Sequence, residues 1–181
     1  MKAIFSGSLR LAGAALLLAA ANAAQADETQ TTTAFAVVET HGTMIPNAEG
    51  GMHVVGTVSG PFFLGTGHGP VDGGDLTCVA DLVANANGTQ TGSGSCVLTA
   101  QDGAMLYADW TCEGVFMVGC QGDFVVDGGT GRLEGVTGGG AMTMRTSETA
   151  WGAGELTSMA ESNGRGILHW EAFSFVPPAA N

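Results

Sequence analysis

The sequence predicts an all-β fold, a closed or nearly closed antiparallel barrel of eight strands. Eight strand-length runs of apolar or alternating residues follow one another, and turn residues separate them. No segment keeps a helical period with caps at both ends. Glycine supplies 30 of the 181 residues, although 45 % of the residues are hydrophobic. We therefore assign this glycine to tight turns between strands and not to a disordered tail.

The first 26 residues have the order of a secretory signal peptide. Lys2 and Arg10 give a basic start, an apolar run follows, and Ala24 and Ala26 mark a small-residue cleavage site. The apolar run is shorter than the roughly 20 residues that span a bilayer. We expect cleavage after Ala26 and export to the periplasm or the extracellular space. Residues 27–181 then form a single barrel domain without a membrane span.

Signal removal leaves a strongly acidic chain. Three arginines stand against 17 acidic residues, so the formal charge is 3 − 17 = −14. Such a surface repels nucleic acid and anionic lipid headgroups, and we expect neither as a partner. The carboxylates are scattered along the chain, which favours a role in solubility over specific cation binding.

The first four predicted strands contain many β-branched residues, and Gly, Asn and Asp residues separate them. Residues 27–32 are expected to be a loose N-terminal segment. The Asn87–Gly88 dipeptide signals a hairpin turn between the third and fourth strands. The four predicted strands cover residues 33–39, 52–60, 75–85 and 94–100, and the segment 60–74 is a candidate to add a short strand before its loop.

The last four predicted strands are richer in aromatic residues. Asp102–Gly103 signals a hairpin turn before the first of them, and a proline pair ends the last. In that last strand, alternation puts Trp170 on one face and Phe173 on the other, so both faces are partly apolar. This pattern predicts that outer-face side chains are buried in a homo-oligomer. The four ranges are 104–112, 122–128, 140–147 and 165–175.

Four cysteines remain after signal removal, an even number in an exported chain, which predicts two disulfides. A hairpin turning near Asn87 places Cys78 opposite Cys96, and Cys112 and Cys120 bracket a short segment. We favour the pairs 78–96 and 112–120. The alternatives are 78–112 with 96–120, and 78–120 with 96–112. The spacings do not suit zinc, and we expect no metal site and no cofactor.

The segment "DGGTGRLEGVTGGG" at residues 127–140 is rich in glycine. It lacks the lysine of a P-loop, and no helix pattern follows it, so a structural corner is the better interpretation. It resembles the Gly-Thr-Gly-x-Phe-x-Gly-x-x-Gly corner of the allene oxide cyclase-like and dirigent-like barrels. The matching residues are Gly129, Thr130, Gly131, Gly135 and Gly138, with Leu133 in place of phenylalanine. The resemblance implies an eight-stranded barrel similar in shape to the calycins, in a family of cyclases and non-catalytic stereochemical guides.

Candidate ligand-binding residues come from the histidines, the tryptophans and the mid-strand charges. His68 lies in a glycine-hinged loop at the predicted barrel mouth. Arg145 and Glu171 form a candidate buried ion pair, because a charge inside a barrel must be paired. For each residue the alternative is an ordinary wall or core position. The full set of candidates is His68, Trp110, Arg145, His169, Trp170 and Glu171.

Three functional hypotheses follow. The chain binds or guides a small apolar or aromatic molecule, it is a cyclase or isomerase acting in the barrel cavity, or it is a solid-core structural protein of the cell envelope. A cavity of a few hundred Å³ separates the first two from the third. Polar groups that converge within the cavity separate the enzyme from the binding protein.

Overall fold

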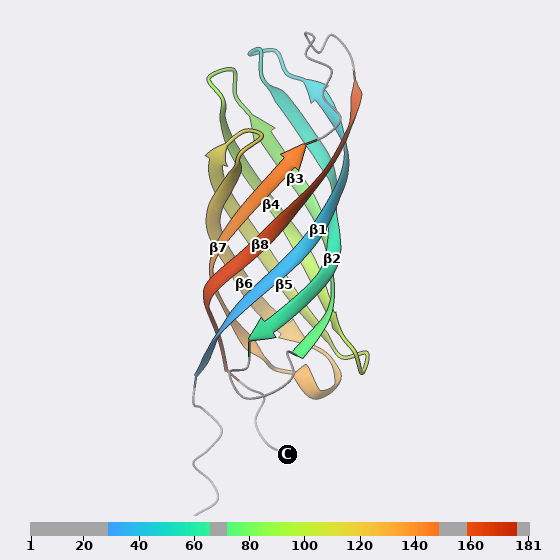
Figure 1. Cartoon of the computed structure of the whole chain (residues 1–181), viewed down its shortest axis with the longest axis vertical. Helices are drawn as coiled ribbons and strands as arrows, with labels where there is room; N and C mark the ends of the chain where they lie inside the picture. The colour runs from blue at the N-terminus through green and yellow to red at the C-terminus, as the bar shows by residue number, and fades with distance from the viewer. Residues whose placement is uncertain (1–28, 66–71, 149–158, 177–181) are drawn as a thin grey trace, which may run out of the picture.

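The computed structural model describes residues 29–65, 72–148 and 159–176. The predicted signal peptide and His68 lie outside these ranges. Within them the chain forms eight antiparallel strands that close into one barrel in the order β1 to β8, with β8 pairing with both β7 and β1 (Figure 1). The described part contains no helix long and apolar enough to cross a membrane.

Each strand pairs with its sequence neighbours, and closure leaves no free sheet edge. A short 3-10 helix, Gly131–Leu133, stands between β6 and β7. The strand bounds are β1 Gln30–Pro46, β2 Met52–Gly65, β3 Asp72–Ala84, β4 Thr89–Ala100, β5 Met105–Val115, β6 Gly119–Gly129, β7 Thr137–Glu148 and β8 Ala160–Val176.

The eight-stranded barrel is confirmed, but most strands are longer than the sequence suggested. β1 begins at Gln30, so the expectation of a loose segment over residues 27–32 is wrong for residues 30–32. These residues pair with Phe173–Phe175 of β8, which ties them into the barrel. The described residues 60–65 continue β2 and do not form an additional strand. Sequence patterns detect the apolar centre of a strand better than its polar ends.

Alternating residues of every strand point inward and form one apolar core. The short helix, the start of β1 and the end of β8 lie at one end of the barrel, which we call the corner end (Figure 1). Aromatic rings pack the interior: the Trp170 ring lies edge-on to both Phe62 and Phe124, with centroids 6.5 and 5.1 Å away, and to Phe173 at 6.2 Å. This part of the barrel is solid.

A bulge in β8 exchanges the two faces of that strand. Trp170 pairs with Ala34 and Phe173 pairs with Thr32, so β8 uses one residue more than β1 over this span. Glu171 and Ala172 both face solvent, and Phe173 returns to the interior with 2 % of its surface exposed. The predicted division of β8 into two continuous faces is therefore wrong beyond Glu171.

Both favoured disulfides are confirmed. Cys78 and Cys96 are opposite each other on β3 and β4, and Cys112 and Cys120 join β5 to β6. All four side chains are buried in the barrel, where they pack as part of the apolar core.

The glycine-rich segment forms the structural corner that its composition predicts. Thr130 N donates to Met105 O at 2.8 Å, and Met105 N donates to Thr130 Oγ1 at 3.1 Å, which fixes the corner to the start of β5. Gly131 and Gly135 have φ values of 60° and 81°, a region that favours glycine. The segment is therefore a corner that joins β6 to β7.

Candidate functional site

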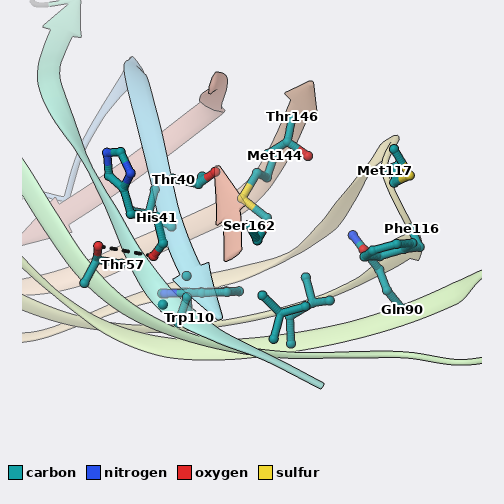
Figure 2. Close-up of a pocket in the computed structure, with 16 residues that line it drawn as sticks. Thr40, His41, Thr57, Gln90, Trp110, Phe116, Met117, Met144, Thr146 and Ser162 are labelled. Atoms are coloured by element: carbon teal, nitrogen blue, oxygen red, sulfur yellow. Dashed lines mark hydrogen bonds between the residues drawn. The ribbon is translucent and has the colours of Figure 1, made fainter. Parts of the chain in front are cut away.

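A recess opens into the barrel at the end opposite the corner (Figure 2). Its cavity measures about 70 Å³. A cavity of about 150 Å³ is needed to hold a benzene molecule, so this recess takes only a small group or the edge of a ring. The residues that matter for its chemistry are Thr40, Gln90, Trp110, Phe116, Met117, Met144 and Ser162.

Polar side chains gather at this end of an otherwise apolar interior. Gln90 on β4 and Ser162 on β8 are the buried polar residues of the core, each 4 % exposed. The Oγ1 atom of Thr40 on β1 is fully buried and has no hydrogen-bond partner among the described residues. A buried hydroxyl without a partner costs about 1–3 kcal/mol. The recess therefore retains an unsatisfied hydrogen-bonding group.

Trp110 forms one wall of the recess because glycines on β4 leave it room. A Cβ atom on Gly94 would lie 2.8 Å from the indole Nε1, and a Cβ on Gly92 would lie 3.2 Å from Cζ3. The indole thus lies flat against the backbone of β4 and is 5 % exposed. The glycine alternation in "GSGSC" is the sequence signal for this arrangement.

The turn between β5 and β6 borders the mouth of the recess. Phe116 and Met117, at the tip of this turn, line the recess, as Figure 2 shows. Phe116 N donates to Gly88 O at 2.9 Å, which ties the turn to the neighbouring hairpin. The Cys112–Cys120 disulfide joins the two strands at the base of the turn. The position of the two side chains is therefore held by covalent and hydrogen-bonded constraints.

The structure brings only part of the predicted set into the interior. Trp110 lines the recess, whereas Trp170 belongs to the solid aromatic core. The interior position suggested for Arg145, His169 and Glu171 is wrong, because all three are exposed on the outer wall.

The physical reason is the strand alternation. Met142 and Met144 of β7 point inward, as do Leu168 and Trp170 of β8, which leaves the residues between them outside. The predicted Arg145–Glu171 ion pair does not form between these described residues. Sequence reasoning missed Thr40, Gln90 and Ser162, since each is a common residue in a strand with no distinguishing motif.

The described histidines lie on the outer wall. His41 Nδ1 hydrogen-bonds Asn163 Oδ1 at 2.8 Å, and His53 Nε2 pairs with Asp81 Oδ1 at the same distance. These contacts fit the interpretation of the histidines as surface residues. Within the described ranges, no three side chains of the metal-ligating types come together.

The groups that face the recess are hydroxyls and an amide. They donate and accept hydrogen bonds, but none of them titrates near neutral pH, so they suit binding better than general acid–base chemistry. His41 contributes to the lining, but its imidazole is engaged with Asn163 on the outer wall.

The chain matches no protein-family model and no curated protein. Among solved structures it is similar to the pterocarpan synthase dirigent protein GePTS1, with 12 % identity and a TM-score of 0.40. The likeness covers 87 % of this chain and 91 % of that chain. At this level of similarity no residue of that protein can be matched to a residue of this one.

Proposed function

We propose that this chain is an exported binding protein that holds the small apolar end of a molecule in the recess and hydrogen-bonds one polar atom of it. The carrying observation is the buried, unpartnered Thr40 Oγ1 beside an apolar cavity. A bound oxygen or nitrogen atom would satisfy this hydroxyl. The apolar walls from Trp110 and Met144 would cover the rest of the inserted group.

The size of the recess limits what enters it. About 70 Å³ is far below the few hundred Å³ expected for a site that encloses a whole substrate. The larger part of a ligand would remain at the mouth, against Phe116 and Met117. This arrangement suits a protein that captures or orients a molecule by one end, and it gives less support to a cyclase that must fold a flexible substrate inside the barrel.

A second candidate function, a solid-core structural protein, is favoured by the aromatic packing around Trp170. The two candidates differ in whether the recess takes up a molecule. Xenon and phenol are suitable probes, because xenon is purely apolar and phenol adds one hydroxyl to a small ring. Binding is measured as shifts in the ¹⁵N–¹H NMR spectrum of residues 27–181.

For the binding protein we expect both probes to shift the signals of Thr40 and the Trp110 indole and to leave those of Trp170 unchanged. Thr40→Val keeps the shape of the side chain but removes the hydroxyl. It should weaken phenol binding about 2- to 10-fold, the equivalent of one hydrogen bond, and leave xenon binding unchanged. Thr77→Val, on the exposed face of β3, is the matched control. If saturating concentrations of xenon and phenol shift no NMR signal of a recess residue, the structural protein is favoured.

Native mass spectrometry of protein purified from its own source supplies an independent test. A retained small molecule would appear as a constant mass increment, lost on unfolding. Fragmentation of that increment would identify the ligand that the binding hypothesis leaves open.

A further inference from the structure

One side of the outer wall, formed by β7, β8, β1 and β2, carries a cluster of exposed apolar side chains. These strands lie side by side across the front of Figure 1. Val37 and Ile167 pair across β1 and β8, and they are 50 % and 49 % exposed. Phe35, 45 % exposed, stacks on Phe63 of β2 with ring centroids 5.0 Å apart. We call this surface the Ile167 face.

Charge is distributed unevenly around the barrel. The sequence from residue 72 to residue 129, which supplies β3 to β6, contains no Lys, Arg or His. The outer wall of these strands bears six exposed carboxylates, from Asp75, Asp81, Asp109, Glu113, Asp123 and Asp127. A two-fold contact that joined this wall to the same wall of a second copy would place carboxylate against carboxylate.

The Ile167 face differs because it carries both signs of charge. Arg145 and Arg165 are two of the three arginines that remain after signal removal, and both are exposed on this face. Arg145 lies beside Ile167 in the β7–β8 register and forms no ion pair among the described residues. Arg165 pairs with Glu39 at 3.5 Å, in an exposed position. Exposed carboxylates of Glu161 and Glu171 lie on the same strand as Arg165.

We infer that the Ile167 face is the contact surface of a two-fold symmetric homodimer. A two-fold interface joins the same patch on both copies, so the patch must complement itself. Here apolar side chains meet apolar side chains, and the arginines of one copy meet glutamates of the other. The four strands are 12 to 17 residues long and about 4.8 Å apart, so this half of the barrel wall measures at least roughly 20 by 40 Å along its curve, of the same order as the about 800 Å² that each partner buries in a standard interface.

The salt dependence distinguishes this arrangement from a head-to-tail one. Two copies of net charge −14 repel, and salt screens that repulsion. The arginine–glutamate pairs across the two-fold contact involve exposed side chains and contribute little, so the largely apolar contact should tighten as salt rises. A contact between the Ile167 face and the acidic wall of another copy would depend on attraction between opposite charges and would loosen. Sedimentation of residues 27–181 from 1 to 100 µM, in 50 and 500 mM NaCl, measures the size of the assembly and the salt dependence of its dissociation constant.

We expect a dimer whose dissociation constant falls as salt rises. Ile167→Glu should raise that constant at least 10-fold, because it places two further carboxylates in the contact. Val125→Glu is the matched control, an exposed valine on β6 that should leave dimerisation unchanged. Melting temperatures of both variants verify that they fold. A monomer at 100 µM, a larger assembly that loosens with salt, or equal effects of the two variants would overturn the inference.

Discussion

The Trp110 indole lies against Gly94, with its Nε1 only 2.8 Å from the place a Cβ atom would occupy. The wall of the recess on β5 therefore depends on the absence of a side chain on β4. A Cβ on Gly94 would also lie 2.0 Å from Val79 O, a backbone atom that cannot move aside cheaply.

Gly94→Ala should consequently lower the stability by at least about 3 kcal/mol, at or above the usual cost of overpacking. Gly92→Ala is the informative comparison, because its Cβ would meet only the side chains of Trp110 and Cys112. We expect a change of about 1 kcal/mol or less, together with a shift in tryptophan emission as the indole moves. Urea unfolding measures the stability of both variants, and equal stabilities would show that the contact with the Val79 carbonyl does not set the cost at Gly94.

The glycine corner contains two kinds of glycine that substitution should separate. Gly135 has a φ of 81° and open space around a Cβ, so Gly135→Ala should cost only the left-handed penalty, about 1–2 kcal/mol. A Cβ on Gly139 would lie 2.0 Å from Phe124 O on β6. Gly139→Ala should therefore cost about 3 kcal/mol or more. Thermal unfolding of the two variants tests this order, and Gly135→Ala as the more damaging change would contradict it.

The sequence predicted the barrel, both disulfides and the corner because each depends on local chemistry. Strand periodicity, hairpin dipeptides and cysteine spacing are all readable over a few residues. The recess was not predictable in this way. It depends on which of two faces a residue presents, and on Thr40, Gln90 and Ser162 coming together from strands far apart in the sequence.

The charged candidates failed for the same reason. Arg145, His169 and Glu171 stand mid-strand, but position along a strand does not decide whether a side chain points in or out. The bulge in β8 adds a second difficulty, since one extra residue reverses the alternation that a pattern assumes to be continuous.

Arg132 holds Asp102 in its charged form at the corner end. Arg132 Nε donates to Asp102 Oδ2 at 2.6 Å, and Ala104 N donates to Oδ1 at 3.1 Å. The arginine hydrogen bond, followed by that from Ala104, holds the pKa of Asp102 below its ordinary value of 3.8. A lowered carboxyl pKa stabilises the fold above the unfolded-state value, and this contribution is lost as pH falls through the folded-state pKa.

Arg132→Ala should accordingly raise the pKa of Asp102, but not fully to its ordinary value, because Ala104 N still donates a hydrogen bond to the carboxylate. Carboxyl ¹³C NMR measures the pKa in both proteins. Any difference in melting temperature near neutral pH should be small, since the pair is exposed, and should vanish once Asp102 is protonated. A pKa for Asp102 that is unchanged in Arg132→Ala would show that the arginine does not set it.

The bulge at Glu171 and Ala172 determines where two phenylalanines go. Gly140 on β7 accommodates it, because a Cβ there would lie 2.3 Å from Ala172 O. Deleting Ala172 removes the extra residue and restores simple alternation along β8. Phe173 then follows the outward-facing Glu171 directly, so it still points inward and still lies opposite Thr32 of β1. Inserting a glycine between Ala172 and Phe173 adds a second extra residue instead, and then either Phe173 and Phe175 turn to solvent or β8 shifts its pairing with β1. Both outcomes of the insertion break the packing of Phe173 against Trp170, whose ring centroids lie 6.2 Å apart.

We expect the glycine insertion to destabilise the barrel by at least about 3 kcal/mol, the usual cost of losing a buried phenylalanine, and to cause aggregation through the exposed rings. The Ala172 deletion keeps Phe173 inside and should be the less damaging change. Ala172→Ser is the control, because this exposed position tolerates a small polar side chain and should change stability by less than about 0.5 kcal/mol. Urea unfolding and light scattering measure the two effects. An insertion variant as stable and soluble as the parent would mean that the pairing of β8 with β1 does not direct Phe173 into the core.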